Sequence, residues 1–172
     1  KVCAVIAESA RAYGTDVSRI ALSNAVGDRV DMRARAELIC ARGEALPFSD
    51  HSFDGAYSFE VLEHVWDPVA VMREALRVVK PGGFILVSTP NRFSLDLHLN
   101  KNFGAVCLDI LFAAARRAYD AMTGAAYCPL CPDLDHEPYP DCDMVASVIP
   151  ANFARAIQAM GCAVDFWDTT YM

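Results

Sequence analysis

Apolar and polar positions follow one another along the chain in blocks that predict alternating helices and strands. Helical spacing covers residues 1–10 and 18–26, and Ser18 suits the capping position of the second helix. Short apolar runs at residues 12–17 and 37–41 predict strands, the first of which ends near Asp16. The first quarter of the chain is therefore expected to read helix, strand, helix, strand.

Residues 44–91 carry the clearest pattern. An apolar run at 53–58 predicts a strand, and apolar positions three or four apart predict a helix over 60–79, within which Pro68 suits a fresh helical start. Pro81, Gly82 and Gly83 are expected to end that helix. The apolar run at 84–88 is typical of a strand buried on both faces. The unit is strand, helix, strand.

Three more elements are predicted toward the C-terminus. Residues 103–122 form a helix that is apolar around most of its circumference, and residues 150–160 form a helix ended by Gly161. A strand over 162–166 follows. This alternation predicts an α/β fold with a doubly wound, mostly parallel sheet, and the 172 residues, 54 % of them hydrophobic, agree with a single domain over 1–172.

Four segments in order resemble successive motifs of the class I S-adenosylmethionine-dependent methyltransferases, in the branch that acts on small molecules: YGTDVSRIALSNA, GEALPFSDHSFD, FEVLEHVWDP and LRVVKPGGFILVSTPN. The resemblance spans residues 2–91. It implies a Rossmann-like methyltransferase fold, S-adenosylmethionine as cofactor, and methyl transfer to an oxygen, nitrogen or carbon of a small, apolar molecule. The alternative is a non-catalytic methyltransferase-like scaffold or partner-binding module.

The resemblance assigns the cofactor's ribose to the end of the first predicted strand. A carboxylate at that point can accept hydrogen bonds from two ribose hydroxyls, which is the role implied for Asp16, with Val17 beside it. The alternative for Asp16 is a plain Asx turn ahead of Ser18.

Adenine binding departs from the family pattern. Family members carry an acid where this chain has Arg42, followed by a small residue, here Gly43. A guanidinium has no acceptor, so Glu44, backbone carbonyls or apolar contact must hold the adenine instead. The turn LPF at residues 46–48 is either a packed turn or an adenine-stacking surface.

The methionine end of the cofactor is assigned to the end of the next strand, at Ser58 and Phe59. His64 follows in the predicted helix and is a candidate for cofactor or substrate contact, or for a catalytic base. Glu63 is interpreted as a first-turn acid favoured by the helix dipole.

Residues 92–145 lie where the family builds its substrate cover. The helix at 103–122, including Leu111, either lines an apolar substrate pocket or forms a homodimer interface. Arg92 and His98 are further candidates for substrate contact. The family's first strand and glycine-rich loop would lie before Lys1, so we expect both to be missing and the chain to be part of a longer protein.

A cysteine-rich stretch follows this region. Cys128 and Cys131 form a C-x-x-C pair, and together with His136 and Cys142 they can close a tetrahedral zinc site. Four prolines and several acids across the same stretch favour an ordinary exposed loop.

Charge and hydropathy exclude several classes of function. The net charge is −7 and no basic cluster extends beyond Arg116 and Arg117, so nucleic acid is not an expected partner. No uncharged segment reaches the roughly 20 residues that span a bilayer. Seven cysteines, an odd number, favour free thiols or a metal over a disulfide framework, and a cytoplasmic location is expected.

Overall fold

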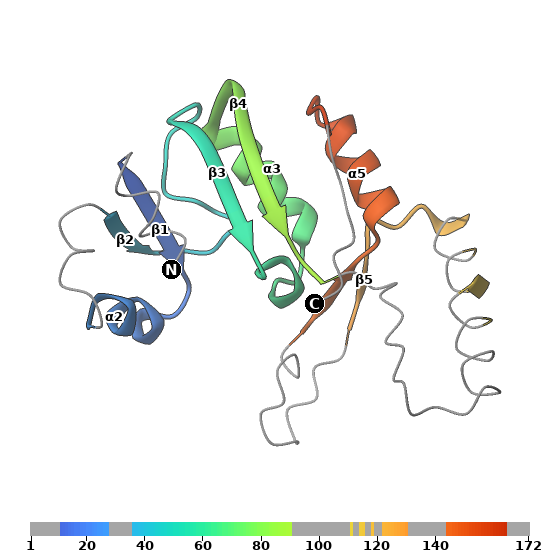
Figure 1. The fold of residues 1–172 in the computed structure, drawn as a ribbon, viewed down its shortest axis with the longest axis horizontal. Helices are drawn as coiled ribbons and strands as arrows, with labels where there is room; N and C mark the ends of the chain where they lie inside the picture. Colours follow the sequence, from blue (N-terminus) through green and yellow to red (C-terminus); the bar gives the residue numbers. More distant parts are fainter. Residues whose placement is uncertain are drawn as a thin grey trace, which may run out of the picture.

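A computed structural model of the chain describes residues 11–27, 36–90, 111, 114–115, 118, 122–130 and 144–164. The helix predicted over residues 1–10 lies outside these ranges, so it stays a prediction. The described elements follow one another in this order (Figure 1): β1 Ala12–Asp16, α2 Arg19–Gly27, β2 Ala36–Cys40, β3 Phe53–Phe59, the 3-10 turn η2 Leu62–His64, α3 Pro68–Val78, β4 Val79–Ser88, β5 Tyr127–Pro129, β6 Ala146–Val148 and α5 Pro150–Ala159.

The first pair of strands confirms the prediction for the N-terminal part. β1 and β2 are parallel and paired residue by residue from Ala12↔Ala36 to Asp16↔Cys40. The helix α2 connects them, as a parallel pair requires. The Ser18 hydroxyl accepts a hydrogen bond from the Ala21 N–H at 3.1 Å, which confirms Ser18 as the capping residue.

The second parallel pair, β3 and β4, forms the centre of the molecule. The helix α3 covers one face of this pair, where Ile85 and Val87 pack on a core that includes Val71 and Met72. The prediction that residues 84–88 are buried on both faces is wrong, because Phe84 and Leu86 are 67 % and 54 % exposed. Successive strand residues point to opposite faces, and in the described part of the chain only one face is covered.

The predicted helix over 60–79 is divided, and its regular part begins eight residues later. Glu60 has a positive φ of 51°, which is not a helical conformation. A single 3-10 turn follows, Val65 is extended, and α3 starts at Pro68. The Asp67 carboxylate accepts the Ala70 N–H at 3.0 Å and caps α3. The predicted helical start at Pro68 was therefore correct, whereas the predicted beginning of the helix at residue 60 was wrong.

The boundary between α3 and β4 also differs from the prediction. Residues 81–83 do not separate helix from strand, since β4 already begins at Val79. Phe53 pairs with Val79 and Gly55 pairs with Phe84, so the register shifts within the pair. Gly82 has a φ of 80°, and a Cβ on Gly83 would lie 2.6 Å from the Asp54 carbonyl oxygen. These glycines allow an irregular stretch inside the strand rather than a break.

The C-terminal part adds an antiparallel pair that the sequence pattern did not predict. β5 pairs with β6, and α5 packs beside α3 through Phe153 and Ile157 (Figure 1). Gly161 has a φ of 86° and ends α5 as predicted. Residues 162–164 are not in a strand, contrary to prediction, and 165–166 lie outside the described residues. The described residues of the 103–122 stretch are helical and exposed.

The described strands form three two-stranded sheets rather than the single sheet that was predicted. Between β1 and β3 lie the rings of Tyr13, Phe48 and Phe53, whose centroids are 4.8–5.6 Å apart in edge-to-face contact. The architecture is α/β with parallel pairs joined through helices. None of the helices in the described ranges combines the length and the apolar character needed to cross a membrane.

Candidate functional site

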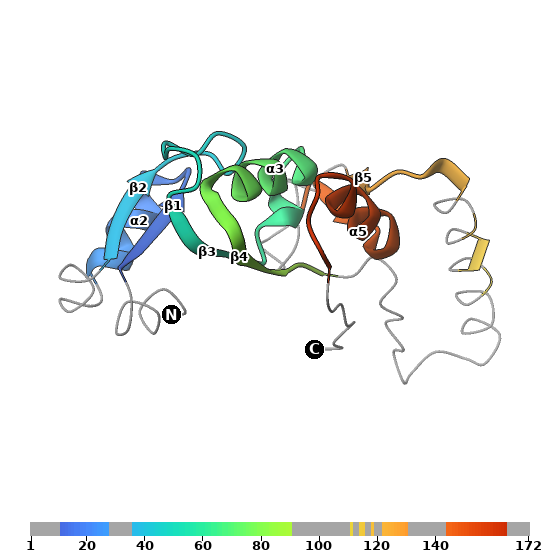
Figure 2. The same ribbon diagram turned by 90° about the horizontal axis from the view of Figure 1, so that it is seen from above.

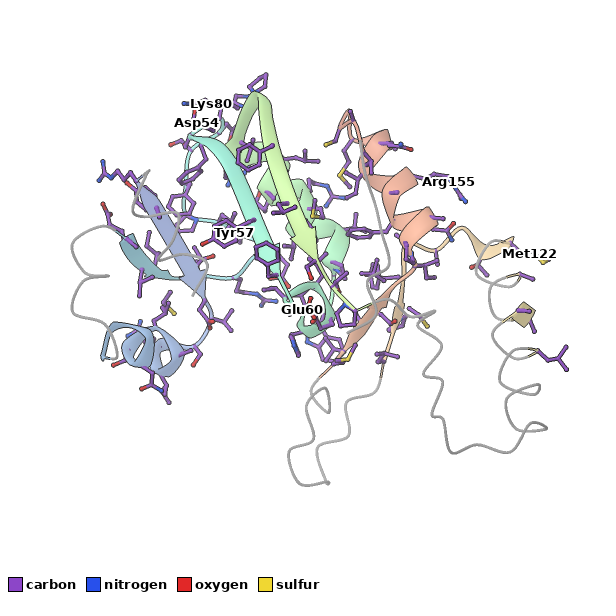
Figure 3. All side chains as sticks on the ribbon, in the orientation of Figure 1. Asp54, Tyr57, Glu60, Lys80, Met122 and Arg155 are labelled. Carbon is purple, nitrogen blue, oxygen red and sulfur yellow. The ribbon has the colours of Figure 1, made fainter. Side chains whose placement is uncertain are left out.

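The candidate site lies at the carboxyl ends of the parallel strands. In open parallel sheets ligands bind beyond these ends, because the connecting loops can diverge there. β3 ends at Phe59 and β4 at Ser88. Figure 3 shows Glu60 at this end, opposite the end that carries Asp54 and Lys80. The side chains that follow the two strands are therefore gathered at one edge.

Two carboxylates and two hydroxyls meet at this edge. The Glu60 N–H donates to the Ser88 carbonyl at 3.0 Å, and the Ser88 hydroxyl donates to the Glu60 carboxylate. The Thr89 hydroxyl donates to Glu63 Oε2 at 3.1 Å. Ser88, the last residue of β4, and Thr89, the next residue, thus each donate to one acid of the segment after β3. The polar residues Ser88 and Thr89 at the end of an apolar run are the sequence signal for this pairing, which was not predicted.

Glu63 is a first-turn acid, as interpreted, but it belongs to the short turn η2 and is buried. Its exposed fraction is 2 %, and burial raises the pKa of its carboxyl. Its backbone carbonyl accepts the Val145 N–H at 2.8 Å, so the residue also anchors the chain that enters β6. The division of the predicted helix at η2 directs this side chain inward.

His64 lies beside Glu63 with its ring partly open to solvent. Its Nε2 is 3.9 Å from Glu63 Oε1, and its side chain is 35 % exposed. An imidazole in this position can contact a bound molecule and accept a proton from it. Ser58 and Phe59, assigned to the methionine end of the cofactor, end β3 just before the turn η2 that carries His64.

Asp16 stands exposed at the carboxyl end of β1. Its Oδ1 accepts the Ser18 N–H at 2.7 Å, which is the Asx turn that was one of two interpretations. Within the described ranges, Oδ2 accepts no hydrogen bond and remains available to a ligand hydroxyl. The turn fixes the carboxylate without using both of its oxygens, so the two interpretations are compatible. Val17, next in the chain, is 66 % exposed.

The residues assigned to adenine follow β2. Glu44 forms an ion pair with Arg42 at 3.5 Å, and its side chain is 19 % exposed. A Cβ placed on Gly43 would lie 3.3 Å from Val71 of α3, so the backbone passes close to the helix there. Phe48 packs against Tyr13 and Phe53, which supports the packed-turn interpretation of residues 46–48.

Other predicted site residues are not brought to this edge by the described structure. Arg92 and His98 lie outside the described residues. Leu111 is 65 % exposed, and Met122, in the same stretch, lies far from Glu60 (Figure 3). Cys128 is a free thiol on β5, and the other three candidate zinc ligands lie outside the described residues: Cys131, His136 and Cys142.

The fold and the edge define a class of α/β proteins that bind a ligand beyond the carboxyl ends of parallel strands. Residues 1–87, half of the chain, match the family described as "Methyltransferase domain". The chain therefore belongs to this family of S-adenosylmethionine-dependent methyltransferases.

Known relatives agree with this membership. A protein of Mycolicibacterium smegmatis described as a probable S-adenosylmethionine-dependent methyltransferase is 49 % identical over 51 residues, 30 % of this chain and 20 % of that protein. A ubiquinone biosynthesis O-methyltransferase of Paraburkholderia phymatum is 36 % identical over 100 residues, 51 % of this chain and 40 % of that protein. The chain thus spans less than half the length of these relatives.

A solved structure shares the fold. The S-adenosylmethionine-dependent methyltransferase of Methanosarcina mazei superposes with a TM-score of 0.56 over 90 % of this chain and 71 % of that one, at 18 % identity. The likeness includes the C-terminal part, which the family match does not reach.

Proposed function

We propose that the protein transfers a methyl group from S-adenosylmethionine to an oxygen, nitrogen or carbon of a small, largely apolar molecule. The observation that carries the proposal is the exposed Asp16 carboxylate, fixed by one oxygen and open at the other, at a strand end within a methyltransferase domain. A carboxylate oxygen held in this way suits a ribose hydroxyl.

We assign the other parts of the cofactor to residues that follow the carboxyl ends of the parallel strands. Gly43 and Glu44 would hold the adenine, Val17 would lie beside the ribose, and Ser58, Phe59 and His64 would face the methionine end. Arg42 cannot accept a hydrogen bond from the adenine amine, whereas the Glu44 carboxylate can if it exchanges its Arg42 partner for the ligand. The donors and acceptors present therefore fit the cofactor.

The sulfonium of S-adenosylmethionine supplies an already activated methyl group. The protein's task is then to orient the acceptor's nucleophile and to exclude water from it. His64 is the candidate group to take a proton from an acceptor that still holds one, because its ring is partly open at this edge.

An apolar acceptor is supported by a relative whose name refers to ubiquinone biosynthesis. Arg92, His98 and Leu111 are the candidate contacts to the acceptor. We also propose a cytoplasmic location and no nucleic-acid partner, supported by the free thiols Cys40, Cys128 and Cys162 and by the net charge of −7. The first strand and glycine-rich loop expected before Lys1 stay a prediction that the upstream gene sequence tests.

The test is calorimetric titration of the natural gene product with S-adenosylmethionine. We expect Asp16→Ala to weaken binding by about 1.5–3 kcal/mol, the range for hydrogen bonds to a charged group. Asp16→Asn is the matched control for the turn, since its amide oxygen still accepts the Ser18 N–H. It should keep the stability of the wild type while losing affinity.

Equal affinity of all three proteins would remove Asp16 from the site. Absence of binding by the wild type would favour the alternative, a methyltransferase-like scaffold. A transfer assay then compares acceptors: a phenol that carries a long alkyl chain should be methylated at a lower KM than the same phenol without it.

A further inference from the structure

The connection between β2 and β3, residues 41–52, lies along α3, and we call it the crossing loop. Gly43 faces Val71, and the Leu46 N–H donates to Glu74 Oε2 at 2.9 Å, two contacts that are each 28 positions apart in the chain. Between these two contacts the loop and α3 each advance by three residues, slightly less than one helical turn of about 3.6 residues. Figure 2 shows the crossing loop on the same side of the β3–β4 sheet as α3.

Arg77 holds the far end of this loop with its whole guanidinium group. Its Nε and Nη2 donate to the two carboxylate oxygens of Glu74, each at 2.8 Å. Nη1 donates to the Phe48 carbonyl and to Asp50 Oδ1, each at 2.8 Å, and Nη2 also donates to the Leu46 carbonyl at 3.1 Å. All five N–H donors of the arginine therefore have an acceptor.

The Glu74–Arg77 pair differs from an ordinary surface ion pair, because both side chains are largely shielded from solvent and both bind the crossing loop. The two side chains are 19 % and 30 % exposed. Hydrogen bonds from Arg77 lower the pKa of Glu74, so the pair remains charged at neutral pH. Glu74 joins the loop by accepting the Leu46 N–H, and Arg77 joins it by donating to two carbonyls, so each residue orients the other.

The loop begins directly after β2, at the edge where Gly43 and Glu44 are proposed to meet adenine. We propose that Arg77 and Glu74 are positioning residues for the adenine side of the cofactor, which fix the crossing loop on α3 so that Gly43 and Glu44 are already in their binding conformation. This inference rests on the proposed function. A loop ordered before binding loses less conformational freedom when the cofactor arrives.

The test compares Arg77→Gln and Arg77→Lys with the wild type in the natural gene product. Lysine keeps the charge but lacks the planar fork that reaches Glu74 and the loop carbonyls together, so it should not rescue. Both variants should raise the Kd for S-adenosylmethionine by about tenfold or more, as expected for lost charge-assisted hydrogen bonds. Amide hydrogen exchange should accelerate at residues 43–48.

The matched control is Lys80→Gln. It breaks the Lys80–Asp54 ion pair of 2.7 Å, at the same end of the sheet and with no contact to the crossing loop. Its Kd and its exchange at residues 43–48 should equal those of the wild type. In turnover, the Arg77 variants should raise the KM for the cofactor while kcat at saturating cofactor is kept. A merely destabilising change would lower the active fraction and therefore kcat.

Unchanged cofactor affinity in a folded Arg77→Gln protein overturns the inference while the proposed function stands. If Arg77→Gln does not fold, Glu74→Gln decides, since its amide oxygen still accepts the Leu46 N–H but the ion pair is lost. It should weaken cofactor binding in the same direction, and an unchanged Kd overturns the inference. Failure of the wild type itself to bind S-adenosylmethionine refutes the proposed function and the inference with it.

Discussion

Glu63 is 2 % exposed, and its carboxylate accepts a hydrogen bond from the Thr89 hydroxyl. Burial disfavours the charged form more than the hydrogen bond favours it, so the pKa is raised. A group with a raised pKa contributes its full stability below its unfolded value and loses that contribution as the pH rises through the folded value.

Replacing Glu63 by Gln keeps an acceptor for Thr89 and removes the ionisation. We expect the wild type to lose stability relative to Glu63→Gln as the pH rises above 4.5, the unfolded value. Urea unfolding at intervals from about pH 4 to about pH 8 measures the difference. Glu37→Gln is the control, because the Glu37 side chain is 56 % exposed. A wild type that gains stability relative to Glu63→Gln over this interval contradicts the prediction.

At the scale of elements, two kinds of contact hold β3, α3 and β4 together. Some join neighbouring residues at the start of α3, and others join residues far apart in the sequence. The Asp67 cap starts the helix, and the Arg77 carbonyl accepts the His51 N–H at 2.9 Å where the helix passes into β4. The irregular stretch of β4 then brings Gly83 against the backbone of β3. The close approach at Gly83 is therefore part of how the two strands find their register.

Gly83→Ala tests this close approach. The new Cβ would lie 2.6 Å from the Asp54 carbonyl oxygen and 3.0 Å from that of Lys80, both of them backbone atoms that cannot rotate away. We expect a loss of about 1–3 kcal/mol in the free energy of unfolding, the usual cost of overpacking. Chemical denaturation measures it.

Gly82→Asn is the matched control in the neighbouring position. Gly82 has a φ of 80° and no heavy atom within 4 Å of an added Cβ, and asparagine tolerates that backbone conformation better than other residues. Its cost should be clearly smaller than that of Gly83→Ala. The reverse order would show that backbone conformation, and not space, decides this stretch.

At the scale of the whole molecule, one apolar core between α3 and α5 joins the β3–β4 pair to the β5–β6 pair, while Tyr13 of β1 contacts Phe53 of β3. That core is made of Leu62, Val71, Met72, Val148, Phe153 and Ile157. It links the segment after β3 to the C-terminal strand pair, so the candidate site edge is supported from both sides. For an exposed residue far from this core, the contacts that matter are those with other molecules.

Leu111 is such a residue. It is 65 % exposed, so a polar substitution there changes the chain's own stability little, and any effect on function reports contact with another molecule. If residues 103–122 cover the acceptor, Leu111→Asp should raise the KM for an apolar acceptor and leave the cofactor Kd unchanged, because an unpaired carboxylate against an apolar ligand is costly. Steady-state kinetics and calorimetry measure the two quantities.

Sedimentation analysis of the wild type and of Leu111→Asp distinguishes a substrate cover from the alternative, a homodimer interface. If Leu111→Asp converts a dimer into a monomer and turnover is retained, the helix is an interface between two copies and not a substrate cover. Leu111→Met is the control, since it keeps an apolar side chain of similar volume and should change neither quantity.

The sequence by itself determined the elements whose signals are short-range. Ser18, the Asp67–Pro68 start and Gly161 were each correctly linked to a helix end, because caps and turns involve residues within a few positions of one another. The two parallel pairs followed from apolar runs separated by helices. Placing Asp16 at a strand end needed no more than these boundaries.

Only the tertiary structure decided which side chains are buried and which distant residues pair. Glu63 is buried because a left-handed Glu60 turns the chain inward, and Arg77 holds a loop 27–31 positions away. The exposed face of β4, the register shift at Gly83 and the pairing of Thr89 with Glu63 likewise depend on segments that meet only after folding. Short-range propensity fixes elements, whereas burial and long-range hydrogen bonds arise from how those elements pack.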